Sequence, residues 1–245
     1  MLRYQYDLKP PQQPALGMIV LKSDQVIEGD FRRMLPPDQP VHVTRVESAA
    51  EVSPRSLQDM ARHMSAAAAL LPEAAEFAAI GYGCTSGTAQ IGAARIAELV
   101  REGRSTGAVS EPLSALVAAS RALGVTRLGL LSPYVASVSD TLRTALGEAG
   151  VETPVFGSFE EAEEARVVAI DPVSIKAAAL DLARQGKVEA LFLSCTNLQT
   201  LDVIEDIEAE TGLPCLSSNQ ALCWHLSRLA GIKARVPGRL GRLAV

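Results

Sequence analysis

Short apolar runs alternate with segments of helical periodicity along the chain. The apolar runs lie at 16–20, 78–85, 128–132 and 190–196. The helical segments lie at 26–34, 56–71, 113–123, 137–149, 173–185 and 221–229. Short apolar runs separated by helices are typical of strands buried on both faces of a parallel sheet. The alternation therefore predicts an α/β protein whose parallel sheets carry helices on both faces.

The same pattern occurs twice. Three pairs of segments resemble each other in the same order: 16–20 with 128–132, 78–85 with 190–196, and 107–112 with 212–217. The middle pair ends in Cys-Thr in both halves, at Cys84 and Cys195, and helical periodicity follows each. We therefore expect two pseudo-symmetric, doubly wound lobes with both cysteines at strand-to-helix turns. Lobe 1 would comprise residues 1–112 plus 219–245, and lobe 2 would comprise residues 113–218.

The repeat also suggests where a ligand binds. Parallel sheets bind ligands at the carboxyl ends of their strands, and two such lobes can bring these ends together in one interlobe cleft. Cys84 and Cys195 would then face each other across one active site. The alternative is that each lobe has its own incomplete site.

The residues around the two cysteines suit acid–base or nucleophilic chemistry. A cysteine at a helix start lies near unpaired N–H groups and the positive end of the helix dipole, which favour the thiolate. Thr85, Ser86 and Gly87 follow Cys84, while Thr196 and Asn197 follow Cys195, and such residues can seat a carboxylate. The alternative is that the cysteines are packing residues, as we expect for Cys215 and Cys223.

Composition and charge narrow the possible partners. The net charge of -5 and the lack of a basic stripe with interleaved aromatics argue against nucleic acid. Neither a secretory signal nor a membrane span is evident, so we expect a cytoplasmic protein with reduced thiols and no membrane partner. His42, His63 and His225 are far apart and no Cys-x-x-Cys spacing exists, so we expect no metal site.

Two motifs resemble those of a known family. Residues 82–87 (Tyr-Gly-Cys-Thr-Ser-Gly) and 194–200 (Ser-Cys-Thr-Asn-Leu-Gln-Thr) resemble the two cysteine motifs of the Asp/Glu racemase superfamily, in its maleate isomerase and arylmalonate decarboxylase branch. Residues 132–134 and 217–222 also fit, so the resemblance spans nearly the whole chain. Within the branch, the sequence is most similar to the racemase-like proteins of ectoine-utilisation operons.

The resemblance implies two flavodoxin-like lobes, no cofactor, and two thiols on opposite sides of a small carboxylate substrate. In racemases of this kind one thiolate removes a proton and the other thiol returns one. In maleate isomerase the cysteine that matches Cys84 attacks the alkene carbon. Arylmalonate decarboxylase keeps only the cysteine that matches Cys195, so the presence of both favours an isomerase or racemase.

Two other functions remain open at this stage: a decarboxylase or lyase that uses Cys195 alone, and a small-ligand-binding protein without turnover. For any of the three we expect a homo-oligomer, either a dimer or a tetramer.

Three further positions bear on the substrate. Asp24 stands where maleate isomerases have an asparagine that binds a substrate carboxylate, and Glu164 falls near a second such asparagine. Because an acid repels a carboxylate and attracts an ammonium, we expect a substrate with both a carboxylate and a cationic nitrogen, such as an amino acid or an ectoine-derived compound. Tyr134 matches a substrate-contacting tyrosine of the family.

Each of these positions also has a structural interpretation. Asp24 could cap the helix that begins near Val26. Glu164 could belong to a solvated acidic run with Glu160, Glu161 and Glu163, which is the interpretation that the sequence favours. Tyr134 could be an amphipathic residue at the rim of a cleft.

Overall fold

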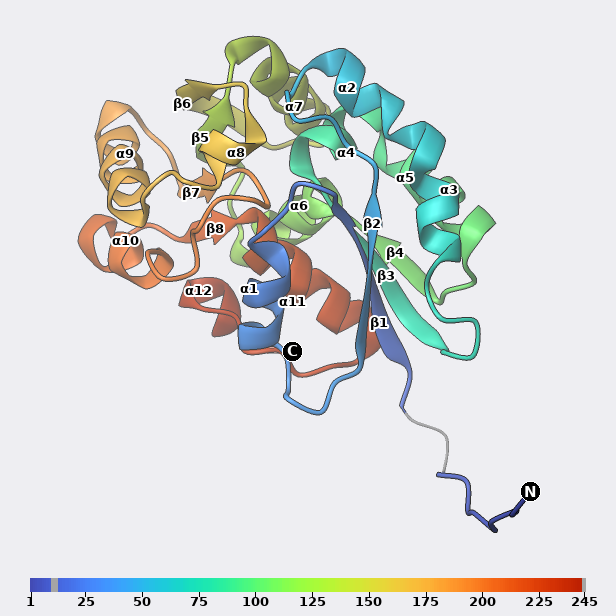
Figure 1. Ribbon diagram of the computed structural model, residues 1–245. Helices are drawn as coiled ribbons and strands as arrows, with labels where there is room; N and C mark the ends of the chain where they lie inside the picture. The colour runs from blue at the N-terminus through green and yellow to red at the C-terminus, as the bar shows by residue number, and fades with distance from the viewer. Residues whose placement is uncertain (10–12, 244–245) are drawn as a thin grey trace.

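The computed structural model describes residues 1–9 and 13–243 and contains two parallel four-stranded sheets (Figure 1). The first sheet has the order β2-β1-β3-β4, with β1 (Ala15–Leu21), β2 (Val41–Val46), β3 (Phe77–Gly83) and β4 (Ala108–Ser110). The second has the order β6-β5-β7-β8, with β5 (Arg127–Tyr134), β6 (Glu152–Glu161), β7 (Ala190–Leu193) and β8 (Cys215–Ser217). The identical order in both sheets confirms the predicted pair of α/β lobes.

Helices separate the strands along both halves of the chain. They are α1 (Ile27–Met34), α2 (Pro54–Asp59), α3 (Ala61–Ala69), α4 (Thr85–Ile91), α5 (Ala93–Gly103), α6 (Pro112–Leu123), α7 (Ala136–Glu148), α8 (Glu164–Val167), α9 (Pro172–Gln185), α10 (Ile204–Thr211), α11 (Ser218–Ala230) and α12 (Gly238–Gly241). The segment predicted as one helix over 56–71 is two helices, because the chain turns at Met60, whose carbonyl accepts an i→i+3 bond from His63 N–H. In the described residues, no helix is both long and apolar enough to cross a membrane.

The last long helix returns to the first sheet. α11 follows β8 in the chain but packs against β3, β4 and α6. The approach to β3 is close: a Cβ at Gly81 would lie 2.6 Å from the Leu226 side chain. This packing supports the grouping of residues 219–245 with lobe 1, a division that stays a prediction.

A short strap joins the two lobes. The loop after β2 pairs with the segment before α8 in an antiparallel bridge between Glu51 and Glu163. Val52 N–H donates to Ala162 O at 2.8 Å, and Glu164 N–H donates to Ala50 O at 3.1 Å. Backbone bonds therefore fix the start of α8 against lobe 1, beside the carboxyl ends of the central strands.

Candidate active site

Cys84 lies where the sequence pattern places it, between β3 and α4. It is the N-cap residue of α4, and its Sγ accepts a hydrogen bond from Gly87 N–H at 3.2 Å. Gly87 leaves room for this thiol, because a Cβ there would lie 2.5 Å from Tyr82 Oη and 3.0 Å from Cys84 Sγ. Thr85 and Ser86, in the first turn of α4, are also buried.

Cys195 lies in a different local structure. β7 ends at Leu193 and α10 begins only at Ile204, so the predicted helix directly after Cys195 is wrong. The backbone turns at Cys195 with φ of 156°, a conformation that L residues rarely adopt. Asn197 N–H donates to Cys195 Sγ at 3.3 Å and fixes a tight turn instead of a helix.

The surroundings of the two cysteines are joined directly. Thr196 Oγ1 donates to Gly83 O at 3.2 Å, which links the residue after one cysteine to the residue before the other. Ser218 Oγ accepts from Cys195 N–H at 3.0 Å and shares a hydrogen bond of 2.7 Å with Thr85 Oγ1. These bonds form one buried interlobe site, as the first interpretation predicts, and not two incomplete sites.

Tyr134 and Glu164 form a buried chain with Cys195. Tyr134 Oη donates to Glu164 Oε1 at 2.6 Å and lies 3.1 Å from Cys195 Sγ. Asn197 Nδ2 donates to the other carboxylate oxygen of Glu164 at 2.9 Å. Tyr134 is 4% exposed, so it is a buried residue of the site and not a rim residue.

The favoured sequence interpretation of Glu164 is wrong. Glu160 and Glu163 are exposed, as a solvated acidic run predicts, but Glu164 is only 3% exposed. The interlobe strap holds its backbone at the start of α8, and this position turns its carboxylate toward Tyr134 and Asn197.

Asp24 has its predicted capping role, and its contact with the substrate stays a prediction. Its Oδ1 accepts from the backbone N–H groups of Val26 and Ile27 at 2.9 and 3.0 Å, which caps the entry to α1. Its Oδ2 is buried without a hydrogen-bond partner. The Thr196 hydroxyl lies close enough to lower the pKa of Asp24, but it donates to the Gly83 carbonyl. Asp24 therefore has one carboxyl oxygen left for a ligand.

Burial dominates the acidity of the site. It raises the pKa of Asp24 from 3.8 to about 6, against the backbone hydrogen bonds that lower it. It also raises the pKa of Cys84 to about 12, with a smaller contribution from the negative charge of Glu164. Gly87 N–H and the Tyr82 hydroxyl lower the pKa of Cys84 without offsetting these effects.

The pKa of Cys195 is also raised well above its ordinary value, first by burial and then by the charge of Glu164. Charge on Cys84 contributes as well, so the two sulfurs lie within electrostatic reach of each other. The prediction that a helix start makes the resting cysteines thiolates is therefore wrong, because desolvation outweighs the helix N-terminus at Cys84 and Cys195 has no helix start.

The sequence interpretation missed Tyr82 and Ser218. Tyr82 lies within the first cysteine motif, two residues before Cys84, and this spacing was its only signal. Ser218 is the first residue of α11 and lies within the capping box that Ser217 forms with Gln220. Cys215 and Cys223 are fully buried core residues, as predicted, and no cluster that could hold a metal ion exists among the described residues.

The fold and the site define a two-lobed α/β protein with two buried thiols in one interlobe site. Residues 31–244 match the family model for arylmalonate decarboxylase. The chain therefore belongs to the arylmalonate decarboxylase family.

Individual relatives in this family have two different activities. A maleate isomerase from Nocardia farcinica is 32% identical over 151 residues, which are 60% of this chain and 59% of that protein. Arylmalonate decarboxylase from Bordetella bronchiseptica is 34% identical over 127 residues, which are 50% of this chain and 52% of that protein. The matches thus span little more than half of each relative. A solved structure of the Nocardia farcinica maleate cis-trans isomerase bound to TRIS has a TM-score of 0.80 at 27% identity, and the match covers 94% of this chain and 98% of that one.

Proposed function

We propose that this protein is a cofactor-independent isomerase, a racemase or a cis-trans isomerase, that uses Cys84 and Cys195 on a small carboxylate with a cationic nitrogen. The observation that carries the proposal is the pair of buried thiols in one hydrogen-bonded interlobe site. The similarity to maleate isomerases supports the same class of reaction.

The hydrogen bonds suggest different roles for the two thiols. Tyr134 has one hydroxyl proton, and the bond of 2.6 Å to the Glu164 carboxylate uses it. The Tyr134 oxygen must then accept from Cys195, so the S–H proton stays on Cys195. Each sulfur accepts one backbone N–H, from Gly87 at Cys84 and from Asn197 at Cys195, so the two thiols differ in the helix start at Cys84 and in the Tyr134–Glu164 pair beside Cys195. Cys84 is therefore the base or nucleophile, and Cys195 is the proton donor.

In a racemisation, the Cys84 thiolate would take the proton from the substrate's α-carbon. Cys195 would give its own proton to the opposite face of the same carbon, which leaves Cys84 as the thiol and Cys195 as the thiolate. In a cis-trans isomerisation, the Cys84 thiolate would instead add to an alkene carbon, and elimination after rotation of the C–C bond would restore it.

The charges around the thiols favour a cation in the substrate. Asp24 and Glu164 bring two buried carboxyl groups to the site, and Oδ2 of Asp24 lacks a partner. Arg45 approaches Asp24 but donates to its backbone carbonyl at 2.9 Å and forms an ion pair with Glu28. A substrate ammonium would offset the two negative charges that raise the pKa of Cys84, and so would help to form the thiolate.

The substrate carboxylate requires hydrogen-bond donors. The first turn of α4 offers backbone N–H groups beside the hydroxyls of Thr85 and Ser86, close to Cys84. A helix start of this kind binds anions well. The substrate would then lie with its carboxylate toward α4 and its nitrogen toward Asp24 and Glu164.

Deuterium exchange with single-cysteine variants tests this proposal. Amino acids and other nitrogen-bearing carboxylates would be incubated in D₂O with the wild type, C84A, C195A and the core control C223A, and followed by NMR and chiral chromatography. We expect α-carbon exchange, racemisation or cis-trans conversion in the wild type and C223A, and none in C84A or C195A. Binding of several of these compounds with no conversion of any would refute an isomerase and leave the small-ligand-binding function.

A decarboxylase is the second candidate, because the family model and the Bordetella bronchiseptica relative carry that activity in their names. Cys195 with Tyr134 would suffice to protonate a carbanion after loss of CO₂. In that case C84A would keep turnover of a malonate-type substrate and C195A would lose it. Loss of turnover in both variants would exclude chemistry through Cys195 alone.

A further inference from the structure

The N-terminal segment has the sequence pattern of a strand. Apolar and polar residues alternate from Leu2 to Leu8, and we call these seven residues the arm. Its four apolar side chains are 80–84% exposed, and their alternation would place them on one face of an extended strand: Leu2, Tyr4, Tyr6 and Leu8. Figure 1 shows the arm pointing away from the body of the molecule. No described part of its own chain covers the apolar side chains of the arm.

The first sheet has an open edge that suits such a strand. In the order β2-β1-β3-β4, β2 pairs with β1 on one side and with no described strand on the other. Val43 of β2 is 38% exposed at this edge. An edge strand with free backbone N–H and C=O groups and an exposed apolar side chain is a template for pairing with another strand.

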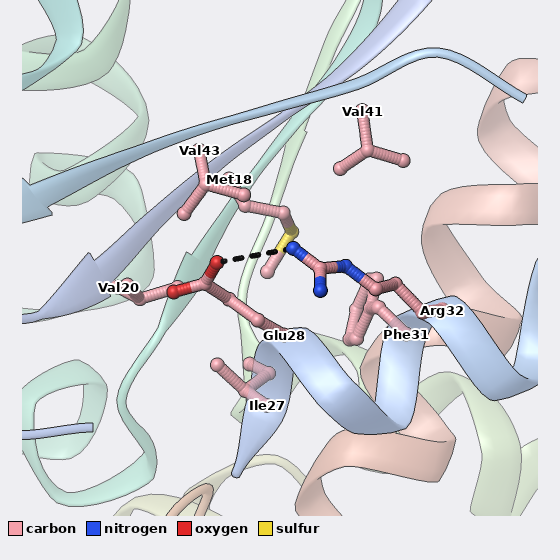
Figure 2. A pocket seen from close by; sticks show the side chains of 8 residues that line it. All are labelled: Met18, Val20, Ile27, Glu28, Phe31, Arg32, Val41 and Val43. Carbon is pink, nitrogen blue, oxygen red and sulfur yellow. Dashed lines mark ion pairs between the residues drawn. The ribbon is translucent and has the colours of Figure 1, made fainter. Parts of the chain in front are cut away.

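An apolar groove lies beside the same edge. It runs between α1 and the sheet and is lined by Val41, Val43, Met18 and Phe31 (Figure 2). Glu28 and Arg32 of α1 also line it and form an ion pair, which Figure 2 marks as a dashed line. Val41 and Val43 alternate along β2 and point to this side, so a strand added next to β2 would place every second side chain along the groove.

We propose that the arm of one copy adds to the outer edge of β2 in a second copy, and that the second copy returns its own arm. The lengths agree, because the seven residues of the arm match the six of β2. Backbone hydrogen bonds would provide affinity, and the groove would receive Tyr4 or Tyr6. A reciprocal exchange has two-fold symmetry and stops at a dimer.

The connection to β1 favours a second copy over the arm's own sheet. The sequence between the arm and β1 includes Pro10, Pro11 and Pro14. Proline-rich linkers favour extended conformations. In Figure 1 the arm itself points away from the body of the molecule, which favours a neighbouring copy as its partner.

Sedimentation velocity of the full chain over a range of concentrations tests the proposal. The arm variant Y4S/Y6S removes the apolar face, and R3S/Q5S is the matched control on the polar face of the same segment. We expect the wild type and the control to dimerise alike and the arm variant to dimerise at least ~30-fold more weakly, as for loss of a buried aromatic anchor. V43D in β2 should weaken dimerisation similarly. A monomeric wild type, or a dimer that Y4S/Y6S leaves unchanged, would overturn the proposal.

Disulfide trapping distinguishes exchange from folding back. One tagged chain would carry Y6C or Y4C, and a differently tagged chain would carry V43C. We expect mild oxidation of the mixture to join the two tags. If the introduced thiols bond only when both are in one chain, and only within that chain, the arm docks on its own β2 and the proposal fails. Circular dichroism checks that each variant is folded, and none of these substitutions changes a residue of the active site.

Discussion

Replacement of Asp24 by asparagine would test the electrostatics of the site. The variant keeps an oxygen that can accept from the N–H groups of Val26 and Ile27, but it removes a charge that is 4% exposed. Burial raises the pKa of Asp24 from 3.8 to about 6. Because each pKa unit corresponds to about 1.4 kcal/mol, ionised Asp24 lowers the free energy of unfolding by about 3 kcal/mol above pH 6.

The direction of the effect follows from linkage. Between pH 3.8 and about 6 the folded protein binds more protons at Asp24 than the unfolded chain does. Its contribution to the free energy of unfolding therefore falls as the pH rises through this window and is constant above it. Asparagine has no such dependence. Burial also raises the pKa of Asp30 to about 6, and the charge of Asp24 adds a smaller contribution, so most but not all of the slope from Asp30 is common to the two proteins.

Urea denaturation of the wild type and D24N across this pH range provides the measurement. We expect the two proteins to differ by less than ~1 kcal/mol near pH 4 and D24N to be up to ~3 kcal/mol more stable at pH 7.5. The free energy of unfolding should increase less in D24A than in D24N, because loss of the capping oxygen costs about 1 kcal/mol. A stability difference between wild type and D24N that does not change with pH would refute a buried, ionisable Asp24. If the substrate is cationic, D24N should also bind it more weakly than the wild type.

Three further outcomes are expected. Y134F removes the acceptor for the Cys195 proton, so steady-state kinetics should show kcat reduced by about 10²-fold, with a smaller change in KM. Gly87→Ala would place a Cβ 3.0 Å from Cys84 Sγ, and chemical denaturation should show a loss of ~1–3 kcal/mol together with lower activity. Iodoacetamide should label Cys84 of the ligand-free protein slowly at pH 7, and the labelling rate should rise about tenfold per pH unit up to pH 10. Mass spectrometry of the labelled peptide would measure this rate. Rapid labelling at pH 7 would contradict the raised pKa of that thiol.

The sequence predicted the fold because its strongest signals are local and repeated. A strand such as β1 is buried along its whole length, and this burial appears in the sequence as an uninterrupted apolar run. The match of three segments in the same order then predicted a second lobe with the same strand order. The turn at Met60 was not predictable, since the helical periodicity continues across it.

The local structure at the second cysteine shows where the repeat misleads. The two Cys-Thr segments are similar, so the sequence predicted a helix start after each. After Cys195, tertiary hydrogen bonds prevent a helix start. The Asn197 side chain accepts from Gln25 N–H in lobe 1 and donates to Glu164 in lobe 2. Contacts that join residues 172 positions apart in the chain leave no local sequence signal.

Glu164 was misinterpreted for a similar reason. Four glutamates within five residues look like a solvated surface. Only the interlobe strap, which pairs this segment with a loop far away in the sequence, turns one of the four inward. The raised pKa of the thiols has the same origin, because the helix start is a local feature whereas burial and the charge of Glu164 depend on the assembled lobes.

The site is thus symmetric in topology and asymmetric in chemistry. If both thiols lay at helix starts with the same neighbours, neither would be the preferred acid. In the proposed mechanism the helix start favours the thiolate at Cys84, whereas the charge of Glu164, bonded to Tyr134, disfavours a thiolate at Cys195. Burial and the charge of Glu164 raise the pKa of both thiols. In the proposed racemisation, this difference between the two cysteine turns would determine which face of the substrate loses a proton and which face receives one.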